Sequence, residues 1–211
     1  MSDAASNPIT FDPTKHLIGY LVRHGELTNM HVWDGWGDLT LSEEGQRQAE
    51  KVAWWVSFMA IGRVVCSDLP RTRQTAEPLM SSGSVLCPYL ACDPNLRPWN
   101  VSEFTGKEKT PARLAEFQKY LDNPTLMIPG GESRQQFSER IQVIFQYLVA
   151  PYEGRITVCI VHNSVIKSLM GLDAMKEAVE PGGIISVSLD GRGEIFYEIV
   201  MGEVKLEQGV S

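Results

Sequence analysis

The apolar positions of the chain fall into short runs separated by stretches of helical periodicity. The runs Leu17–Val22, Arg63–Cys66 and Ile156–Val161 are too short for helices and are typical of buried strands. A further run, Val85–Cys92, contains Pro88 and therefore predicts a strand at the edge of a sheet. Because the strands alternate with helices, the pattern predicts a three-layer α/β/α sandwich with a mostly parallel central sheet.

Apolar residues three and four positions apart predict the helices between these strands. Ser42 is a good N-cap for the first helix, and Glu43 and Glu44 suit the positive end of its dipole. Pro70 stands at the favoured first position of a second helix that reaches about Met80. The remaining predicted elements are a helix at 112–121, one long helix after Ser133 with Phe137, Ile141, Ile144, Phe145 and Leu148 on its core face, a helix at 165–172, and a closing hairpin of strands 184–189 and 194–200.

Length, composition and charge limit the class of protein. The 211 residues, 43% of them hydrophobic, suffice for one sizeable domain, and we assign 1–15 to a flexible leader and 16–211 to a single domain. The net charge of −7 argues against nucleic acid or an anionic membrane as the partner. Since the sequence has no secretory signal, no apolar run that could span a membrane and no zinc-like cysteine spacing, we expect a cytoplasmic protein with buried free thiols. The oligomeric state stays open.

Cationic and imidazole side chains follow three of the predicted strands. The first strand ends at Arg23 and His24, Arg71 comes shortly after the second, and His162 directly follows the strand 156–161. If these strands are parallel, their carboxyl ends meet at one edge of the sheet, where ligands bind in open α/β folds. Arginine presents a planar fork of donors that matches a phosphate or carboxylate, and histidine can act as nucleophile, base or metal ligand.

This set of residues favours phosphoryl chemistry over two other kinds of site. A zinc site would need carboxylate or thiolate partners at ligand spacing, and the chain contains neither H-x-H nor H-E-x-x-H. A Ser-His-Asp hydrolase of the common α/β type would need a G-x-S-x-G elbow, which is also absent. Two arginines with two histidines suit a phosphoryl group because positioning and charge neutralisation dominate its transfer.

The motifs of the chain resemble, in the same order, those of the histidine phosphatase superfamily, which has the phosphoglycerate mutase-like fold. Leu21–Glu26 contains its R-H-G-E motif, 39–49 is similar to its L-T-x-x-G-x-x-Q-A stretch, and Ser67–Ala76 is similar to S-x-L-x-R-x-x-x-T-A. Pro129–Ser133 matches P-G-G-E-S, and Val161-His162 matches the second histidine of the family. Five matches in register cover most of the chain.

The resemblance implies a metal-independent phosphatase that needs no cofactor and forms a phosphohistidine from a small phosphorylated metabolite or phosphoprotein. In that mechanism Arg23 and Arg71 hold the phosphoryl oxygens bidentately, and His162 hydrogen-bonds them. Two rival functions stay open: a phosphoglycerate mutase-type phosphotransferase, and a non-catalytic phosphate-binding module. The residues implied for the site are His24 as the nucleophile, with Arg23, Arg71, His162, Asn29 and Asn163 as phosphate ligands.

One loop departs from the family pattern. Family members commonly read L-x-E-x-x-x-G-x-x-E-G with the first glutamate as proton donor, and here Pro98 occupies that place. Proline cannot transfer a proton, so we predict Glu103, in the same loop, as the substitute acid. Glu26 and Asp34 are the carboxylates to consider if the donor lies outside this loop.

Overall fold

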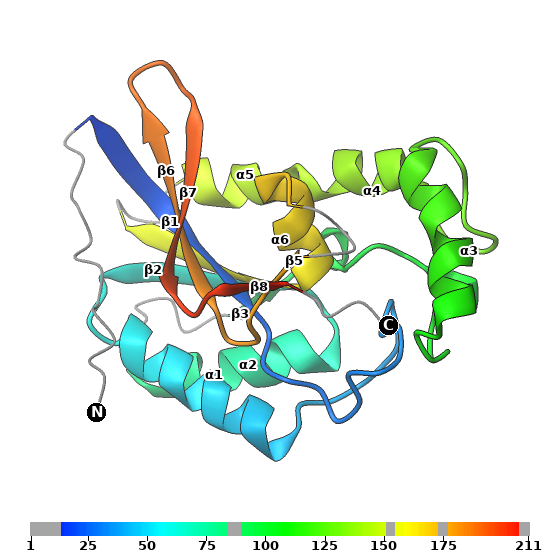
Figure 1. Cartoon of the computed structure of the whole chain (residues 1–211). Helices are drawn as coiled ribbons and strands as arrows, with labels where there is room; N and C mark the ends of the chain where they lie inside the picture. Colours follow the sequence, from blue (N-terminus) through cyan, green and yellow to red (C-terminus); the bar gives the residue numbers. More distant parts are fainter. Residues whose placement is uncertain (1–13, 84–89, 151–154, 173–176, 207–211) are drawn as a thin grey trace, which may run out of the picture.

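The computed structural model describes residues 14–83, 90–150, 155–172 and 177–206, and a central sheet runs through it with helices on both faces (Figure 1). The strands lie in the order β3-β2-β4-β1-β6-β7, in which β3, β2, β4 and β1 are mutually parallel and β6 and β7 are antiparallel additions. The predicted three-layer sandwich with a mostly parallel sheet is confirmed. The strands of this sheet are β1 (Lys15–Arg23), β2 (Ile61–Cys66), β3 (Leu90–Cys92), β4 (Ile156–Val161), β6 (Ile184–Asp190) and β7 (Ile195–Met201).

Helices α1 (Glu43–Val56) and α2 (Pro70–Ser81) cover one face of the sheet, and α4 (Arg134–Ile141), α5 (Val143–Val149) and α6 (Asn163–Met170) lie on the other (Figure 1). Both predicted helix starts are confirmed, because the Ser42 hydroxyl accepts the Gly45 N–H at 3.0 Å and Pro70 opens α2. The other elements are α3 (Pro111–Asp122), which stands at one side, the short 3₁₀ helices η1 (Pro94–Leu96) and η2 (Ser102–Phe104), and a small sheet of β5 (Glu177–Val179) and β8 (Val204–Leu206).

The alternation of side chains along the strands divides the core into two layers. In β1, Tyr20 and Val22 pack with the apolar face of α1 and α2, whereas Leu21 packs on the opposite side of the sheet. In β4, Ile160 and Val161 divide in the same way. Because both faces of these central strands are covered, their sequences are continuously apolar, as in parallel sheets generally.

The helical segment after Ser133 differs from the prediction of one long helix. It is two successive helices, α4 and α5, which are separated at Gln142. The Gln142 N–H binds the Glu139 carbonyl at 3.3 Å, and the Phe145 N–H binds the Gln142 carbonyl at 3.1 Å. These bonds span three residues rather than four, so the turn is tighter there and the regular α-helix is interrupted.

Smaller differences concern strand and helix ends and one thiol. The edge strand β3 is seen only over its last three residues, because 84–89 lie outside the described residues, and α6 begins two residues earlier than predicted. The prediction of buried thiols holds for Cys66 and Cys159 and is wrong for Cys92, which is exposed on the edge strand. Cys87 and the leader residues 1–13 lie outside the described residues, so the division into leader and single domain stays a prediction.

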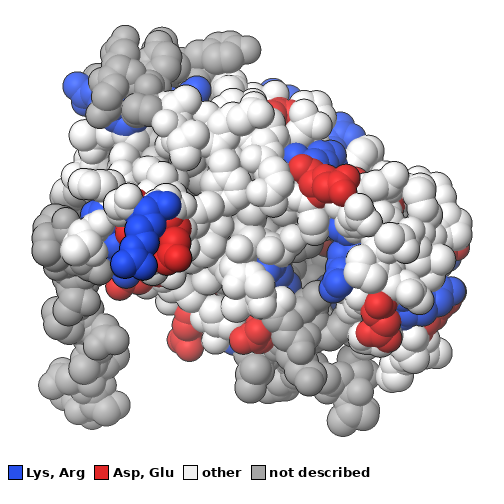
Figure 2. All heavy atoms as spheres, turned by 90° about the horizontal axis from the view of Figure 1, so that it is seen from above, with Lys and Arg blue, Asp and Glu red and all other residues white. Residues whose placement is uncertain are grey.

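The charges on the surface agree with the acidic composition. On the face seen from above, Lys and Arg side chains are scattered, and several have Asp or Glu beside them (Figure 2). Among the described residues on this face they form no extended basic surface. Within the described ranges, every helix is too short or too polar to cross a membrane.

Candidate active site

The ends of the three parallel strands meet as expected. Arg23 in β1 is level with Val161 in β4, and β2 ends beside β4. The N–H of His24 binds the carbonyl of Val161 at 3.0 Å, which fixes the backbone just after β1. As a result the rings of His24 and His162 lie with their centroids 5.2 Å apart. The sheet therefore brings together two histidines that are far apart in the sequence.

The chain leaves β1 through a glycine that the packing requires. A Cβ added at Gly25 would lie 2.4 Å from the carbonyl oxygen of Gly45, and one added at Gly45 would lie 2.1 Å from the carbonyl oxygen of Glu26. No Cβ atom tolerates such distances from a backbone atom. The Gly25 N–H also binds the hydroxyl of Thr75 in α2 at 3.1 Å. The R-H-G segment is thus held between the start of α1 and the middle of α2.

The His24 ring is neutral and has a defined tautomer. Its Nδ1 lies 2.8 Å from the carbonyl oxygen of Gly25, and a carbonyl can only accept, so Nδ1 carries the proton and Nε2 the lone pair. Burial, together with the charges of Arg71 and Arg23, lowers the pKa of His24 to about 3 against the opposing influence of Asp34. A neutral imidazole with its lone pair on Nε2 has the form that a nucleophile requires.

His162 uses both ring nitrogens within the protein. The Arg71 Nε–H donates to Nδ1 at 3.2 Å, so the proton of the neutral ring is on Nε2, which donates to the Ser67 hydroxyl at 2.7 Å. Burial, with the charge of Arg71, places the pKa of His162 well below its usual value. In this arrangement the N–H of His162 is given to Ser67, and its predicted hydrogen bond to a phosphoryl oxygen stays a prediction.

Arg71 is fully buried in α2 and binds the loop 34–37. Its Nη1 donates to the Gly37 carbonyl at 2.8 Å and its Nη2 to the Gly35 carbonyl at 2.7 Å. Nη2 also forms an ion pair with the Asp34 carboxylate at 3.1 Å. The guanidinium fork thus holds the loop 34–37, and the bidentate phosphate contact of Arg71 stays a prediction.

A cavity of about 1070 Å³ opens at the strand ends. Five of the predicted site residues line it, whereas Arg71 and Glu103 do not. Arg23 is one of the lining residues and donates from Nη1 to the carbonyl of Val179. The five predicted residues in the lining are Arg23, His24, Asn29, His162 and Asn163.

The two asparagines are both engaged with the backbone. The Asn29 side-chain oxygen accepts the N–H of His31 at 3.0 Å on the exposed loop, and that of Asn163 accepts the N–H of Val179 at 3.2 Å. Each amide group keeps its NH₂ donors, which is the part that a phosphoryl oxygen would use. Their assignment as phosphate ligands stays a prediction.

The walls of the cavity contain residues that the sequence did not single out. One wall is apolar and is built by α3 and by the loop after β1, with Leu114, Phe117, Leu121, Val32 and Trp33 among its residues. Besides Arg23, and Asp34 which the sequence named only as an alternative donor, the charged side chains in the lining are Lys109, Arg134 and Lys167. The apolar residues of α3 follow helical spacing, but no spacing rule marks these three charged residues, because they come from separate segments of the chain.

Glu103, the predicted substitute acid, lies outside this cavity. It sits on η2, where its carboxylate accepts a hydrogen bond from the Tyr120 hydroxyl at 3.4 Å. Neither residue belongs to the cavity lining. The structure therefore does not bring Glu103 together with His24 and His162.

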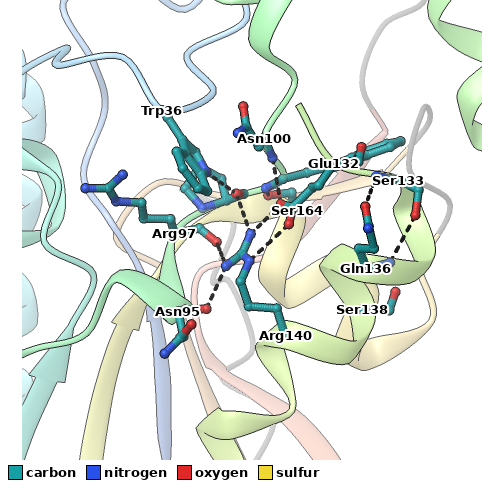
Figure 3. Close-up of polar contacts among 12 residues, drawn as sticks. Trp36, Asn95, Arg97, Asn100, Glu132, Ser133, Gln136, Ser138, Arg140 and Ser164 are labelled. Carbon is teal, nitrogen blue, oxygen red and sulfur yellow. Dashed lines mark hydrogen bonds and ion pairs between the residues drawn. The ribbon is translucent and has the colours of Figure 1, made fainter. Parts of the chain in front are cut away.

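Arg140 of α4 binds the loop that contains Pro98 through hydrogen bonds to its backbone carbonyls (Figure 3). Arg140 donates to the carbonyls of Asn95, Arg97 and Pro98 at 2.7, 3.0 and 3.1 Å. Its ion pair with Glu132 joins this loop to the P-G-G-E-S motif. The glutamate of that motif thus has a structural part here, since it holds the arginine that supports the loop.

Comparisons with known proteins agree with the fold and show the family. The sequence profile of the histidine phosphatase superfamily (branch 1) matches residues 19–180, and the chain belongs to this superfamily. The probable phosphoglycerate mutase GpmB of Erwinia tasmaniensis is 30% identical over 172 residues, which are 75% of this chain and 77% of that protein. The GpmB of Proteus mirabilis is 31% identical over 169 residues, with the same shares covered.

Solved structures give the same result. A phosphoglycerate mutase from Thermus thermophilus has a TM-score of 0.63 and 28% identity, over 86% of this chain and 98% of that one. A mycobacterial glucosyl-3-phosphoglycerate phosphatase has a TM-score of 0.67 and 21% identity, over 87% and 97% of the two chains, and so shares the fold. The relatives carry the names of both mutases and phosphatases.

Proposed function

We propose that this protein is a phosphomonoesterase that works through a phosphohistidine at His24 and needs no metal ion. The observation that carries the proposal is the state of the His24 ring: it is neutral, its Nδ1 proton is given to the Gly25 carbonyl, and its Nε2 lone pair is left for attack. His24 and Arg23 line the same cavity, so a phosphoryl group bound there would contact both the nucleophile and a cation.

The reaction has two displacements. In the first, Nε2 of His24 forms a bond to phosphorus while the ester P–O bond breaks and the alcohol leaves. In the second, water attacks phosphorus, the P–N bond breaks, and the electron pair returns to Nε2. Arg23 neutralises the phosphoryl charge from within the cavity, and Arg71 adds its charge from behind the loop 34–37.

The size and lining of the cavity indicate the kind of substrate. They also favour transfer of the phosphoryl group to water over its transfer to a second hydroxyl, as in a mutase. A volume of about 1070 Å³ is at the upper end for small-molecule sites, and far more than a three-carbon sugar acid fills. The apolar wall with Leu114, Phe117 and Leu121 offers no hydrogen bonds to a polyhydroxy acid. We therefore assign the substrate as a phosphate monoester of a bulkier, partly apolar alcohol.

The second candidate is a mutase, which the names of the GpmB relatives favour. A mutase would return the phosphoryl group to a second hydroxyl, so incubation with 3-phosphoglycerate would interconvert its isomers with little release of inorganic phosphate. Phosphorus NMR separates the two activities in one sample. A non-catalytic phosphate-binding module would show neither.

The deciding experiment measures phosphate release from a panel of monoesters with small polar, alkyl and aryl alcohols. We expect hydrolysis of the larger apolar esters, a phosphoenzyme trapped by alkaline rapid quench, competitive inhibition by vanadate, and full activity in EDTA. Absence of both phosphate release and phosphoenzyme with every ester would contradict the enzyme assignment. Activity that EDTA abolishes and zinc or magnesium restores would contradict the metal-free mechanism.

A further inference from the structure

We propose that Asp34 is the proton donor and acceptor of this site, in place of the family glutamate whose position Pro98 occupies. The inference rests on the proposed phosphatase function. Its starting observation is that one carboxylate oxygen of Asp34 and one ring nitrogen from each of His24 and His162 all lie within 4.8 Å of one another. An acid at that position can reach the oxygen that leaves a phosphorus bound to His24.

Asp34 is held in place by its own loop. Arg71 forms the ion pair with its carboxylate at 3.1 Å and also binds the carbonyls of Gly35 and Gly37. Within the loop, the Gly37 N–H binds the Asp34 carbonyl at 2.8 Å. Arg71 is fully buried, whereas the Asp34 side chain is 31% exposed and lines the cavity. The Asp34 carboxylate is therefore held by Arg71 on its buried side and is accessible to a substrate on the side that lines the cavity.

No other carboxylate among the described residues lines this cavity. Glu26 accepts a hydrogen bond from the Ser42 hydroxyl at 2.9 Å and faces a separate cleft. Glu103 lies by Tyr120, outside the lining. Of the carboxylates weighed for the missing donor, only Asp34 is in reach of both histidines.

The loop of Asp34 is fastened to the segment that lacks the family donor. The Trp36 indole N–H donates to the carbonyl of Pro98 at 2.9 Å, and the Arg97 guanidinium lies 4.7 Å from the centre of the Trp36 ring. Figure 3 shows Trp36 against this segment. This contact joins the two loops. The loop with Pro98 lacks the family glutamate, and the loop joined to it supplies the Asp34 carboxylate to the cavity.

The same three side chains are also of the types that bind metals, but their surroundings oppose a cation. Arg71 lies 3.1 Å from the Asp34 carboxylate, and Arg23 lines the same cavity. Both nitrogens of His162 and the Nδ1 of His24 are already hydrogen-bonded within the protein. Only Nε2 of His24 and one carboxylate stay available, which suits an anion flanked by positive charge.

In the proposed reaction Asp34 donates one proton and takes up one proton. As the Nε2–P bond forms and the ester P–O bond breaks, the Asp34 carboxyl gives its proton to the leaving oxygen. When water attacks the phosphohistidine, the Asp34 carboxylate takes the proton of that water, and the P–N pair returns to Nε2 of His24. Asp34 is protonated again, and the net change is ester plus water to alcohol plus phosphate.

The pKa of Asp34 predicts where the proton that it donates comes from. Burial raises the pKa of Asp34, but the positive charges of Arg71 and Lys109 oppose this, and its pKa lies below the ordinary value, so the free enzyme holds a carboxylate. A phosphate monoester, with a second pKa of about 6, brings the proton as its monoanion. Since the pKa values of both histidines lie well below that range, we expect kcat/KM for alkyl esters to fall with a single limb above about pH 6.

The test compares Asp34→Asn with Asp38→Asn, the same change at an exposed residue on the same loop that does not line the cavity. We expect Asp34→Asn to lower kcat/KM for an alkyl phosphate by about a hundred- to a thousandfold. The loss for p-nitrophenyl phosphate should be under about tenfold, because that leaving group departs without a proton. Asp38→Asn should leave both within about twofold.

A role limited to holding Arg71 would give a different result. Both esters would then lose activity equally in Asp34→Asn, vanadate would bind more weakly, and the alkaline limb would persist; this outcome overturns the inference. Asp34→Glu, which keeps a carboxylate, should recover part of the alkyl activity, and it serves as the test if Asp34→Asn does not fold. If wild type hydrolyses neither ester, the proposed function itself has failed.

Discussion

The edge of the sheet and the loops above it are built in different ways. At the edge, His24 and His162 directly follow two parallel strands that are in register, and packed helices fix the backbone on either side. Above it, the loop 34–37 is bound by Arg71 and the loop with Pro98 by Arg140, and the Trp36 indole joins the two loops. In the mechanism that we propose, the sheet supplies the nucleophile, whereas the loops decide where the proton comes from and which alcohol fits.

The strongest test of the sheet edge is His24→Ala. Loss of the nucleophile should reduce kcat by more than about a thousandfold for every ester, because removal of a nucleophile generally abolishes the covalent route. The phosphoenzyme seen after rapid quench of the wild type should disappear. A folded variant with unchanged vanadate binding and a substantial residual rate would show that another residue accepts the phosphoryl group.

Arg71→Lys tests the contacts by which Arg71 joins His162 at the sheet edge to the loop 34–37. Lysine keeps the charge but cannot bind the carbonyls of Gly35 and Gly37 and the ring of His162 at once, so the loop should shift. We expect kcat/KM to fall by about a hundredfold, with a lower Tm. Arg73→Lys, at an exposed arginine on the same helix, is the matched control and should stay near wild type. Equal activity of the two variants would mean that positive charge alone suffices.

The buried histidines make the edge sensitive to acid. The pKa of His24 is about 3 in the folded chain, below its ordinary value, so the unfolded chain binds more protons between about pH 6.5 and 3. The free energy of unfolding should therefore fall with falling pH, by up to about 1.4 kcal/mol per pH unit for one such histidine. Urea unfolding of His24→Gln should show a shallower fall, whereas His31→Gln, at an exposed histidine, should keep the wild-type slope.

The smallest effect is expected at Glu103, in the loop region. Because it binds Tyr120 and does not line the cavity, Glu103→Gln should change kcat/KM by less than about twofold for alkyl and aryl esters alike. The measurement is the same leaving-group series as for Asp34→Asn. A selective loss on alkyl esters would restore Glu103 as the acid and remove Asp34 from that role.

Much of the fold can be predicted from the sequence because it depends on local patterns. Ser42 and Pro70 set helix starts through capping and a fixed φ, and the apolar runs that end at Val22 and Val161 have the period of buried strands. The resemblance to a family then placed a nucleophile at His24. These conclusions need only neighbours along the chain and the rule that parallel strand ends meet.

The tertiary structure alone decided the details around that nucleophile. That Arg71 faces the loop 34–37, that His162 gives its N–H to Ser67, and that Asp34 rather than Glu103 borders the cavity all depend on contacts between distant segments. Sequence spacing places residues on an element, but a buried donor binds whichever acceptor the folded chain brings within about 3 Å. For these side chains the acceptor comes from another element, so only the folded chain determines it.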